Sequence, residues 1–103
     1  MTSKQRAYLR SLSANIDPLF QIGKSSLTPE FTNAIIETFQ NKELIKIAVL
    51  KNCADDPKEI ANILAERSGS QVVQVIGKKI VLYRENPKKK NKIELPKAKK
   101  NQE

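Results

Sequence analysis

Apolar residues recur along this chain with two spacings, one typical of helices and the other typical of strands. Spacings of three and four, with polar residues between them, predict helices over 3–14, 29–41 and 57–68. Short runs rich in β-branched residues predict strands over 19–22, 44–50, 72–76 and 80–84. The predicted order is therefore helix, strand, helix, strand, helix, strand, strand.

Capping residues support these helix limits. Thr2 with Gln5 fits a capping box, and Thr28-Pro29-Glu30 combines a capping hydroxyl, a first-turn proline and an acid at the positive end of the helix. Asp56-Pro57 repeats the cap and the proline, which explains these acids without a metal site. Gly69 is expected to end the third helix, because glycine adopts the left-handed conformation without strain.

The connections between the strands predict how they pair. Strands joined through a helix favour parallel pairing, whereas Gly77-Lys78 alone separates the last two strands and fits a type II′ hairpin turn. We expect one compact α/β domain in which helices pack on a four-stranded mixed sheet. The domain should cover residues 1–96, with 85–96 as a transition and 97–103 as a basic, disordered tail.

Charge narrows the class of partner. The 103 residues carry 19 Lys and Arg against 11 Asp and Glu, which gives a formal net charge of +8. Residues 85–103 hold seven of the lysines and three of the acids. Such a balance attracts polyanions, nucleic acid first, and a basic tail adds affinity through counterion release without choosing a sequence. The alternative interpretation is a solubilising surface.

The residue types of this chain give little support for a catalytic function. The chain has no histidine, and Cys53 is its one cysteine, so neither an internal disulfide nor a multi-cysteine metal site can form. Gly23-Lys24-Ser25 matches the end of a nucleotide phosphate loop, but Pro18 stands where the upstream glycine belongs. We expect no enzyme activity, no cofactor, no metal and no small-molecule substrate.

Apolar stretches are too short to cross a bilayer, and no apolar core of a signal peptide follows the first basic residues. We therefore expect no membrane partner and a cytoplasmic location. Phe31 and Phe39 lie at helical spacing beside Ile35, which favours a place in the core over base stacking.

The stretch from Gln21 to Glu30 concentrates the candidate chemistry. Gly23 follows a predicted strand, Lys24, Ser25 and Ser26 come next, and a helix begins directly afterwards. Backbone amides ahead of a helix N-terminus, next to a lysine, form a potential anion site. Arg6 and Arg10 are four residues apart and share one side of the first helix, where they offer further contacts to phosphates or form a solvated basic face.

Several motifs occur together in one order along the chain. They are Lys4-Gln5-Arg6-x-Tyr8-Leu9-Arg10-x-Leu12, Gln21-Ile22-Gly23-Lys24-x-x-Leu27-Thr28, Glu43-Leu44-Ile45-Lys46, Val73-Gln74-Val75-Ile76-Gly77-Lys78 and Val81-Leu82-Tyr83-Arg84. This set resembles the YhbY-like proteins, the stand-alone bacterial form of the CRM (chloroplast RNA splicing and ribosome maturation) domain. The resemblance extends from about Lys4 to Pro96 and implies an RNA-binding domain similar in fold to the C-terminal domain of translation initiation factor three.

The resemblance also gives the loop a role. The family's loop is usually Gly-x-x-Gly, similar to the KH loop that clamps backbone nucleotides, and here it corresponds to residues 23–26. Ser26 stands where the second glycine is expected. Glycine permits positive φ and close backbone approach, both of which serine restricts, although a serine hydroxyl can itself donate to a phosphate.

Bacterial members of the family are associated with precursors of the large ribosomal subunit. We therefore expect a monomer that binds ribosomal RNA of these precursors and assists assembly, with a protein-docking module or a binder of introns or other structured RNA as the alternatives. The candidate RNA-binding residues are Lys4, Arg6, Arg10, Gly23, Lys24, Ser25, Ser26, Lys78, Lys79 and Arg84.

Overall fold

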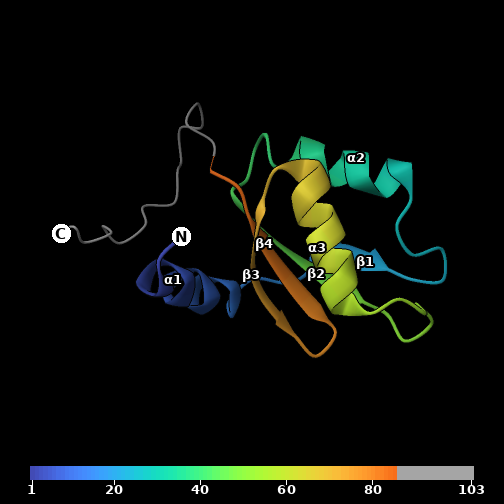
Figure 1. Ribbon diagram of the computed structural model, residues 1–103, viewed down its shortest axis with the longest axis horizontal. Coiled ribbons are helices and arrows are strands. Elements are labelled where there is room, and N and C mark those ends of the chain that lie inside the picture. The colour runs from blue at the N-terminus through green and yellow to red at the C-terminus, as the bar shows by residue number, and fades with distance from the viewer. Residues whose placement is uncertain (86–103) are drawn as a thin grey trace.

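Helices and strands follow one another in the predicted order in the computed structural model, which describes residues 1–85 (Figure 1). The helices are α1 (Ser3–Ser13), α2 (Pro29–Thr38) and α3 (Pro57–Ser68). The strands are β1 (Phe20–Ile22), β2 (Leu44–Val49), β3 (Gln71–Ile76) and β4 (Lys79–Tyr83). The predicted α/β domain is confirmed, whereas the predictions for residues 86–103, the tail included, lie outside the described residues.

The sheet has the strand order β1-β2-β4-β3. β1 and β2 pair in parallel, as expected for strands joined through a helix, and β4 pairs antiparallel with both β2 and β3. The expectation of parallel pairing fails for β2 and β3, because β4 is inserted between them. The tight hairpin after β3 returns the chain beside its own strand, so β4 takes the neighbouring place.

Capping geometry sets the helix limits much as the sequence predicts. Thr2 and Gln5 form the complete capping box, and the Thr28 hydroxyl accepts from the Phe31 amide at 3.0 Å. Gly69 ends α3 with φ 68°, as a left-handed cap. The expected end of the second helix near residue 41 is wrong, because after Thr38 the amides of Gln40 and Asn41 donate to the carbonyls three residues back instead of four.

The side of the sheet that faces α2 and α3 holds the larger core. Residues Ile45, Ile47 and Val49 alternate toward this side along β2, as the period of a strand requires. Phe39 is buried among them, and Phe31 packs edge-on against Phe20 with ring centroids 5.6 Å apart. Both phenylalanines thus take the core positions that their spacing predicts.

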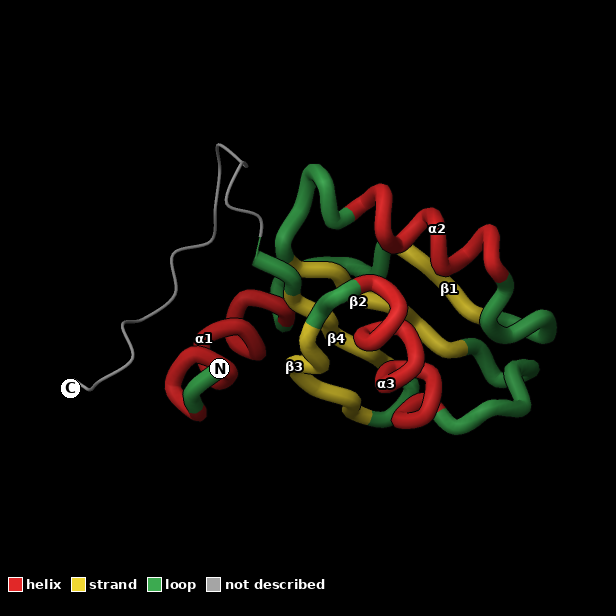
Figure 2. The backbone as a smooth tube through the Cα atoms, turned by 45° about the horizontal axis from the view of Figure 1, so that its top comes forward, coloured by secondary structure: helices red, strands yellow, loops and turns green. Residues whose placement is uncertain are grey.

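The opposite side of the sheet carries α1 and a smaller core. It consists of Leu9, Leu44, Val73, Val81 and Tyr83, all buried. Lys46 also faces this side, and its Nζ donates to the carbonyl of Ser13 at 3.2 Å, near the negative end of α1. Figure 2 shows α1 apart from α2 and α3, which lie together.

Candidate nucleic-acid interface

Connections from different parts of the chain meet at one end of the sheet, at the right and bottom of Figure 1. Because β1 and β2 are parallel, the loops that follow Ile22 and Val49 leave the sheet side by side. The Val49 amide donates to the Lys78 carbonyl at 2.7 Å, which brings the β3–β4 turn to the same end. We call this region the loop end; it comprises residues 23–28, 50–56 and 77–79.

The loop of residues 23–26 is a closed turn. The Ser26 amide donates to the Gly23 carbonyl at 3.0 Å, and Ser26 adopts φ 53°, a left-handed conformation that usually favours glycine. The Ser26 hydroxyl donates to the carboxylate of Asp55, in the connection between β2 and α3. The Ser26 hydroxyl, which could donate to a phosphate, is thus engaged by the protein, while the backbone keeps a glycine-like conformation.

Gly23 permits a close approach rather than an unusual backbone angle. A Cβ atom at this position would lie 3.3 Å from Oδ1 of Asn52 and 3.6 Å from Cδ1 of Leu50. The Leu50 amide also donates to the Ile22 carbonyl at 2.8 Å, which extends the parallel pairing beyond the strands. The absent side chain therefore lets the two loops pack against each other.

Exposed lysines surround the loop end. Lys24, Lys78 and Lys79 all lie there, so the structure brings together the loop and the hairpin turn, whose proximity the sequence alone does not establish. At a strand spacing of about 4.8 Å, β1 and β4 are separated by about 10 Å. Lys51, also exposed, lies in the connection that follows β2, the strand between β1 and β4, and the sequence-based predictions did not include it. Its place directly after β2 is the signal that could have found it.

The remaining predicted residues lie elsewhere. Lys4, Arg6 and Arg10 belong to α1, and Arg84 follows β4 at the end of the sheet opposite to the loop end, where its amide donates to the Glu43 carbonyl at 2.9 Å. Arg6 is half-buried, and its Nη1 donates to the carbonyls of Val72 at 2.5 Å and Val73 at 3.1 Å. The candidate residues therefore form two groups instead of one patch.

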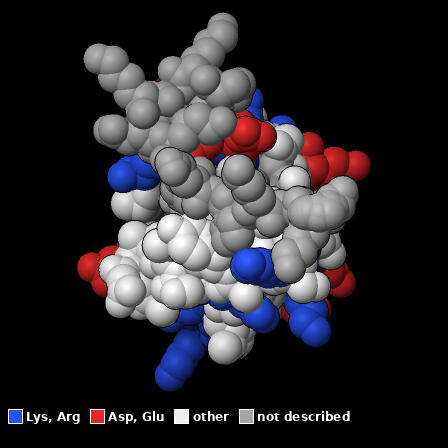
Figure 3. Space-filling model, turned by 90° about the vertical axis from the view of Figure 1, so that its left-hand side faces the viewer, with Lys and Arg blue, Asp and Glu red and all other residues white. Residues whose placement is uncertain are grey.

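Figure 3 views the side of the molecule that carries α1. Basic side chains are spread along the lower part and the flanks of this face, acidic side chains appear at its margins, and uncharged residues fill the middle. Among the side chains in view on this face, the basic ones are scattered rather than joined in one patch.

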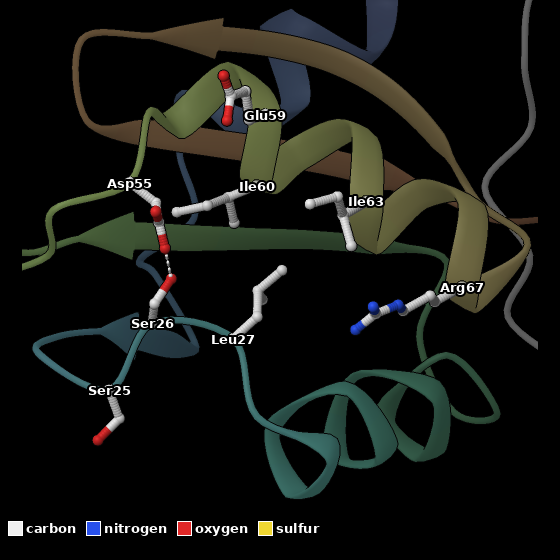
Figure 4. Close-up of a pocket in the computed structure, with 8 residues that line it drawn as sticks. All are labelled: Ser25, Ser26, Leu27, Asp55, Glu59, Ile60, Ile63 and Arg67. Atoms are coloured by element: carbon white, nitrogen blue, oxygen red, sulfur yellow. Dashed lines mark hydrogen bonds between the residues drawn. The ribbon is translucent and has the colours of Figure 1, made fainter.

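A hollow of about 380 Å³ opens beside the loop (Figure 4). Its lining comes from the segment before α2, from the connection ahead of α3, and from one side of α3 between its first and last turns. The lining residues are Ser25, Ser26, Leu27, Asp55, Glu59, Ile60, Ile63 and Arg67. The sequence reasoning did not identify this hollow, because its two walls are about 30 residues apart in the chain.

Comparison with known proteins now assigns the family. The protein-family model of the CRS1 / YhbY (CRM) domain matches residues 1–84 of the sequence, nearly all of the described chain. The chain belongs to the CRM domain family. The resemblance seen in the sequence motifs is thereby confirmed.

Two relatives and one solved structure match this CRM domain over almost their full length. The "Probable RNA-binding protein YqeI" of Bacillus subtilis is 43% identical over 96 residues, which cover 93% of this chain and 99% of the relative. An "RNA-binding protein" of Haemophilus influenzae is 30% identical, with 93% and 95% covered. The solution structure of SAV1595 from Staphylococcus aureus matches with a TM-score of 0.78 and 52% identity, covering 93% of this chain and 99% of that one.

Residues 1–85 contain no group of three or more His, Cys, Asp or Glu side chains that could hold a metal ion. Within the same residues, no helix is long and apolar enough to cross a membrane. Cys53 is 8% exposed and packs in the larger core, a place that suits a small apolar side chain.

Proposed function

We propose that this CRM domain binds ribosomal RNA of large-subunit precursors and assists their assembly, with the loop end as the surface that contacts the RNA backbone. The observation that carries the proposal is that Lys24, Lys78 and Lys79 lie at the same end of the sheet as the turn that precedes α2. Amides at a helix N-terminus favour an anion, and lysines add the charge that phosphates attract. The names of the relatives support RNA as the class of ligand.

Backbone contacts should dominate over base contacts in this mode of binding. The aromatic side chains of residues 1–85 are largely committed to the cores, and Tyr8, on α1, is 38% exposed. Lysines read phosphate positions, which are set by RNA shape rather than by sequence. Structured ribosomal RNA is therefore a better partner for this surface than an unstructured messenger.

The proposal includes a cytoplasmic monomer that works without a cofactor, metal or small-molecule substrate, and that is not an enzyme. The absence of histidine removes the commonest general base from the whole chain. A protein-docking role, or binding to introns or other structured RNA, is the competing function. Fractionation distinguishes them: we expect the protein on particles of large-subunit precursors, and its absence from them would contradict the assembly role.

The binding surface is tested by titrating ribosomal RNA fragments over a salt series. We expect affinity to fall steeply with salt, and Lys24→Ala to lower affinity roughly fivefold and the salt slope by about 1. Lys42→Ala, an exposed lysine after α2 and away from the loop end, is the matched control and should change little. If removing residues 97–103 abolishes binding while Lys24→Ala has no effect, the loop is not the site.

A further inference from the structure

The hollow beside the 23–26 loop has an apolar middle. Figure 4 shows Leu27 on one wall and Ile60 and Ile63 on the facing side of α3, with their side chains directed into the space between. Ile60 is buried, but Ile63 is 38% exposed and Leu27 is half-buried, so both present apolar surface to the open hollow. A flat apolar group placed between these walls would cover that surface.

Polar groups mark the two ends of the hollow. At one end Asp55 holds the Ser26 hydroxyl, and at the other the Arg67 guanidinium is directed toward Leu27 (Figure 4). Glu59 and Ser25 also line the hollow, but their polar atoms are turned away from its middle. A ligand would therefore meet a carboxylate at one end and a planar cation at the other.

From this arrangement we infer that the hollow receives one unstacked base of the RNA whose backbone lies on the 23–26 loop, and that guanine is the preferred base. The inference rests on the proposed function and deepens it. Ser26 belongs both to the loop and to the hollow, so a backbone on the loop delivers a base directly to this space. Unstacked bases are held by stacking on apolar or guanidinium groups and by hydrogen bonds at their edges, which Arg67 and Asp55 can supply.

Asp55 provides the selectivity. An ionised carboxylate only accepts hydrogen bonds, and each of its oxygens has two acceptor positions, so the bond from Ser26 leaves acceptors open. The Watson–Crick edge of guanine offers adjacent N–H donors that match a carboxylate. The same edge of uracil has one N–H between two carbonyl oxygens, which the carboxylate repels. Guanine is thus favoured and uracil disfavoured.

The test is a nuclear magnetic resonance titration of the whole protein with two short RNAs, five uridines and the same strand with a central guanosine. We expect the guanosine strand to bind about tenfold more tightly, the scale of one good paired contact to a base edge. Methyl signals of Leu27 and Ile63 should shift on binding. Equal affinity for the two strands, or no shift of these methyls at millimolar RNA, overturns the inference.

Variants separate the base contact from the backbone contact. Asp55→Asn keeps an oxygen for the Ser26 hydroxyl but adds N–H donors, so the preference for guanosine should fall to about one. Glu66→Gln removes the same charge from an exposed position of α3 that does not line the hollow and should keep the preference, while Lys24→Ala should weaken both strands equally. An unchanged preference in Asp55→Asn overturns the inference.

The two levels of the proposal fail differently. Suppose that ribosomal RNA fragments bind and that Lys24→Ala weakens this binding, but that the guanosine strand binds no more tightly than the uridine strand. The proposed backbone surface is then supported and the base pocket is contradicted. If ribosomal RNA itself does not bind, the proposed function falls. Ile63→Glu, at an exposed position, is the second check of the pocket: it should lower affinity for the guanosine strand, and an unchanged affinity contradicts the pocket.

Discussion

Basic residues serve different purposes at the α1 side and at the loop end. On the α1 side, Arg6 donates to the carbonyls of Val72 and Val73, and Lys46 donates to the carbonyl of Ser13. At the loop end, the lysines are exposed and lie at the same end of the sheet as the tight turn of residues 23–26. The difference teaches that a count of positive charges does not locate a nucleic-acid surface, because some cations are already committed to the fold.

A local irregularity explains why Arg6 is committed. The register of β3 against β4 shifts between Val72 and Gln74, which leaves Val73 as an extra residue in an edge strand. A bulge of this kind leaves a carbonyl without a partner in the ladder, and an exposed edge invites pairing with other chains. The guanidinium has several donors in a fixed plane and can satisfy two neighbouring carbonyls at once.

The largest expected effect concerns this contact. Arg6→Ala removes charge-assisted hydrogen bonds to half-buried carbonyls and should lower the free energy of unfolding by about 2–3 kcal/mol. Arg10→Ala, one turn later and exposed, should change it by less than about 0.5 kcal/mol. Urea denaturation measures both values, and similar losses in the two variants would contradict the structural role of Arg6.

The next largest effect is expected in RNA affinity, measured for variants of the loop end and of α1. Lys78→Ala with Lys79→Ala should weaken binding of ribosomal RNA fragments roughly tenfold, because both lysines lie at the loop end. Lys4→Ala with Arg10→Ala removes the same charge from α1 and should weaken binding about twofold. If the α1 pair has the greater effect in an anisotropy titration, the RNA lies mainly on α1.

Particular residues show how much of the structure can be predicted from the sequence. The capping pairs and the Gly77 turn are local signals, so the elements and their order follow from neighbouring residues; Gly77 has φ 57°, as a type II′ turn requires. Arg6 illustrates the opposite case. It shares a helix face with Arg10, and only the bulge in β3, 66 residues away, decides that its charge is used within the fold.

In the candidate site, too, some residues follow from local motifs and others depend on contacts between distant parts of the chain. Lys24 follows from its local motif, since a glycine turn and a helix start flank it directly. The Ser26–Asp55 bond joins residues 29 positions apart and depends on the parallel pairing of β1 and β2, so the motif alone could not reveal it. The place of Lys51 and the hollow depend on the same pairing.

Alkaline pH provides a smaller test of the α1 side. Burial, with the nearby charges of Glu43 and Glu85, raises the pKa of Tyr83 to about 12, from 10.0. The neutral phenol is thus favoured in the folded state, and its contribution is complete below pH 10 and is lost as pH rises toward 12. We expect the free energy of unfolding to fall by about 1–2 kcal/mol over this range.

Tyr83→Phe is the control for that titration. Phenylalanine keeps the ring in the smaller core with Leu9 but has no proton to lose, so its stability should fall less over the same interval. The titration of lysines contributes to both proteins and cancels in the difference. Parallel pH profiles for the two proteins, measured by thermal unfolding, would show that Tyr83 ionises without cost to the α1 side.

The smallest effect is expected at the position where serine replaces a glycine. Ser26 adopts φ 53°, which strains a residue with a Cβ atom by about 1 kcal/mol or more, and its hydroxyl bond to Asp55 offsets this strain. Ser26→Gly relieves the strain but loses the bond and makes the unfolded chain more flexible, so stability should change by less than about 0.5 kcal/mol. Ser26→Ala keeps the strain and loses the bond, and should cost about 1 kcal/mol. Chemical denaturation of the pair distinguishes the two terms. A glycine variant that is less stable than the alanine variant would mean that the backbone angle carries no strain. An alanine variant as stable as the natural protein would mean that the bond to Asp55 contributes nothing.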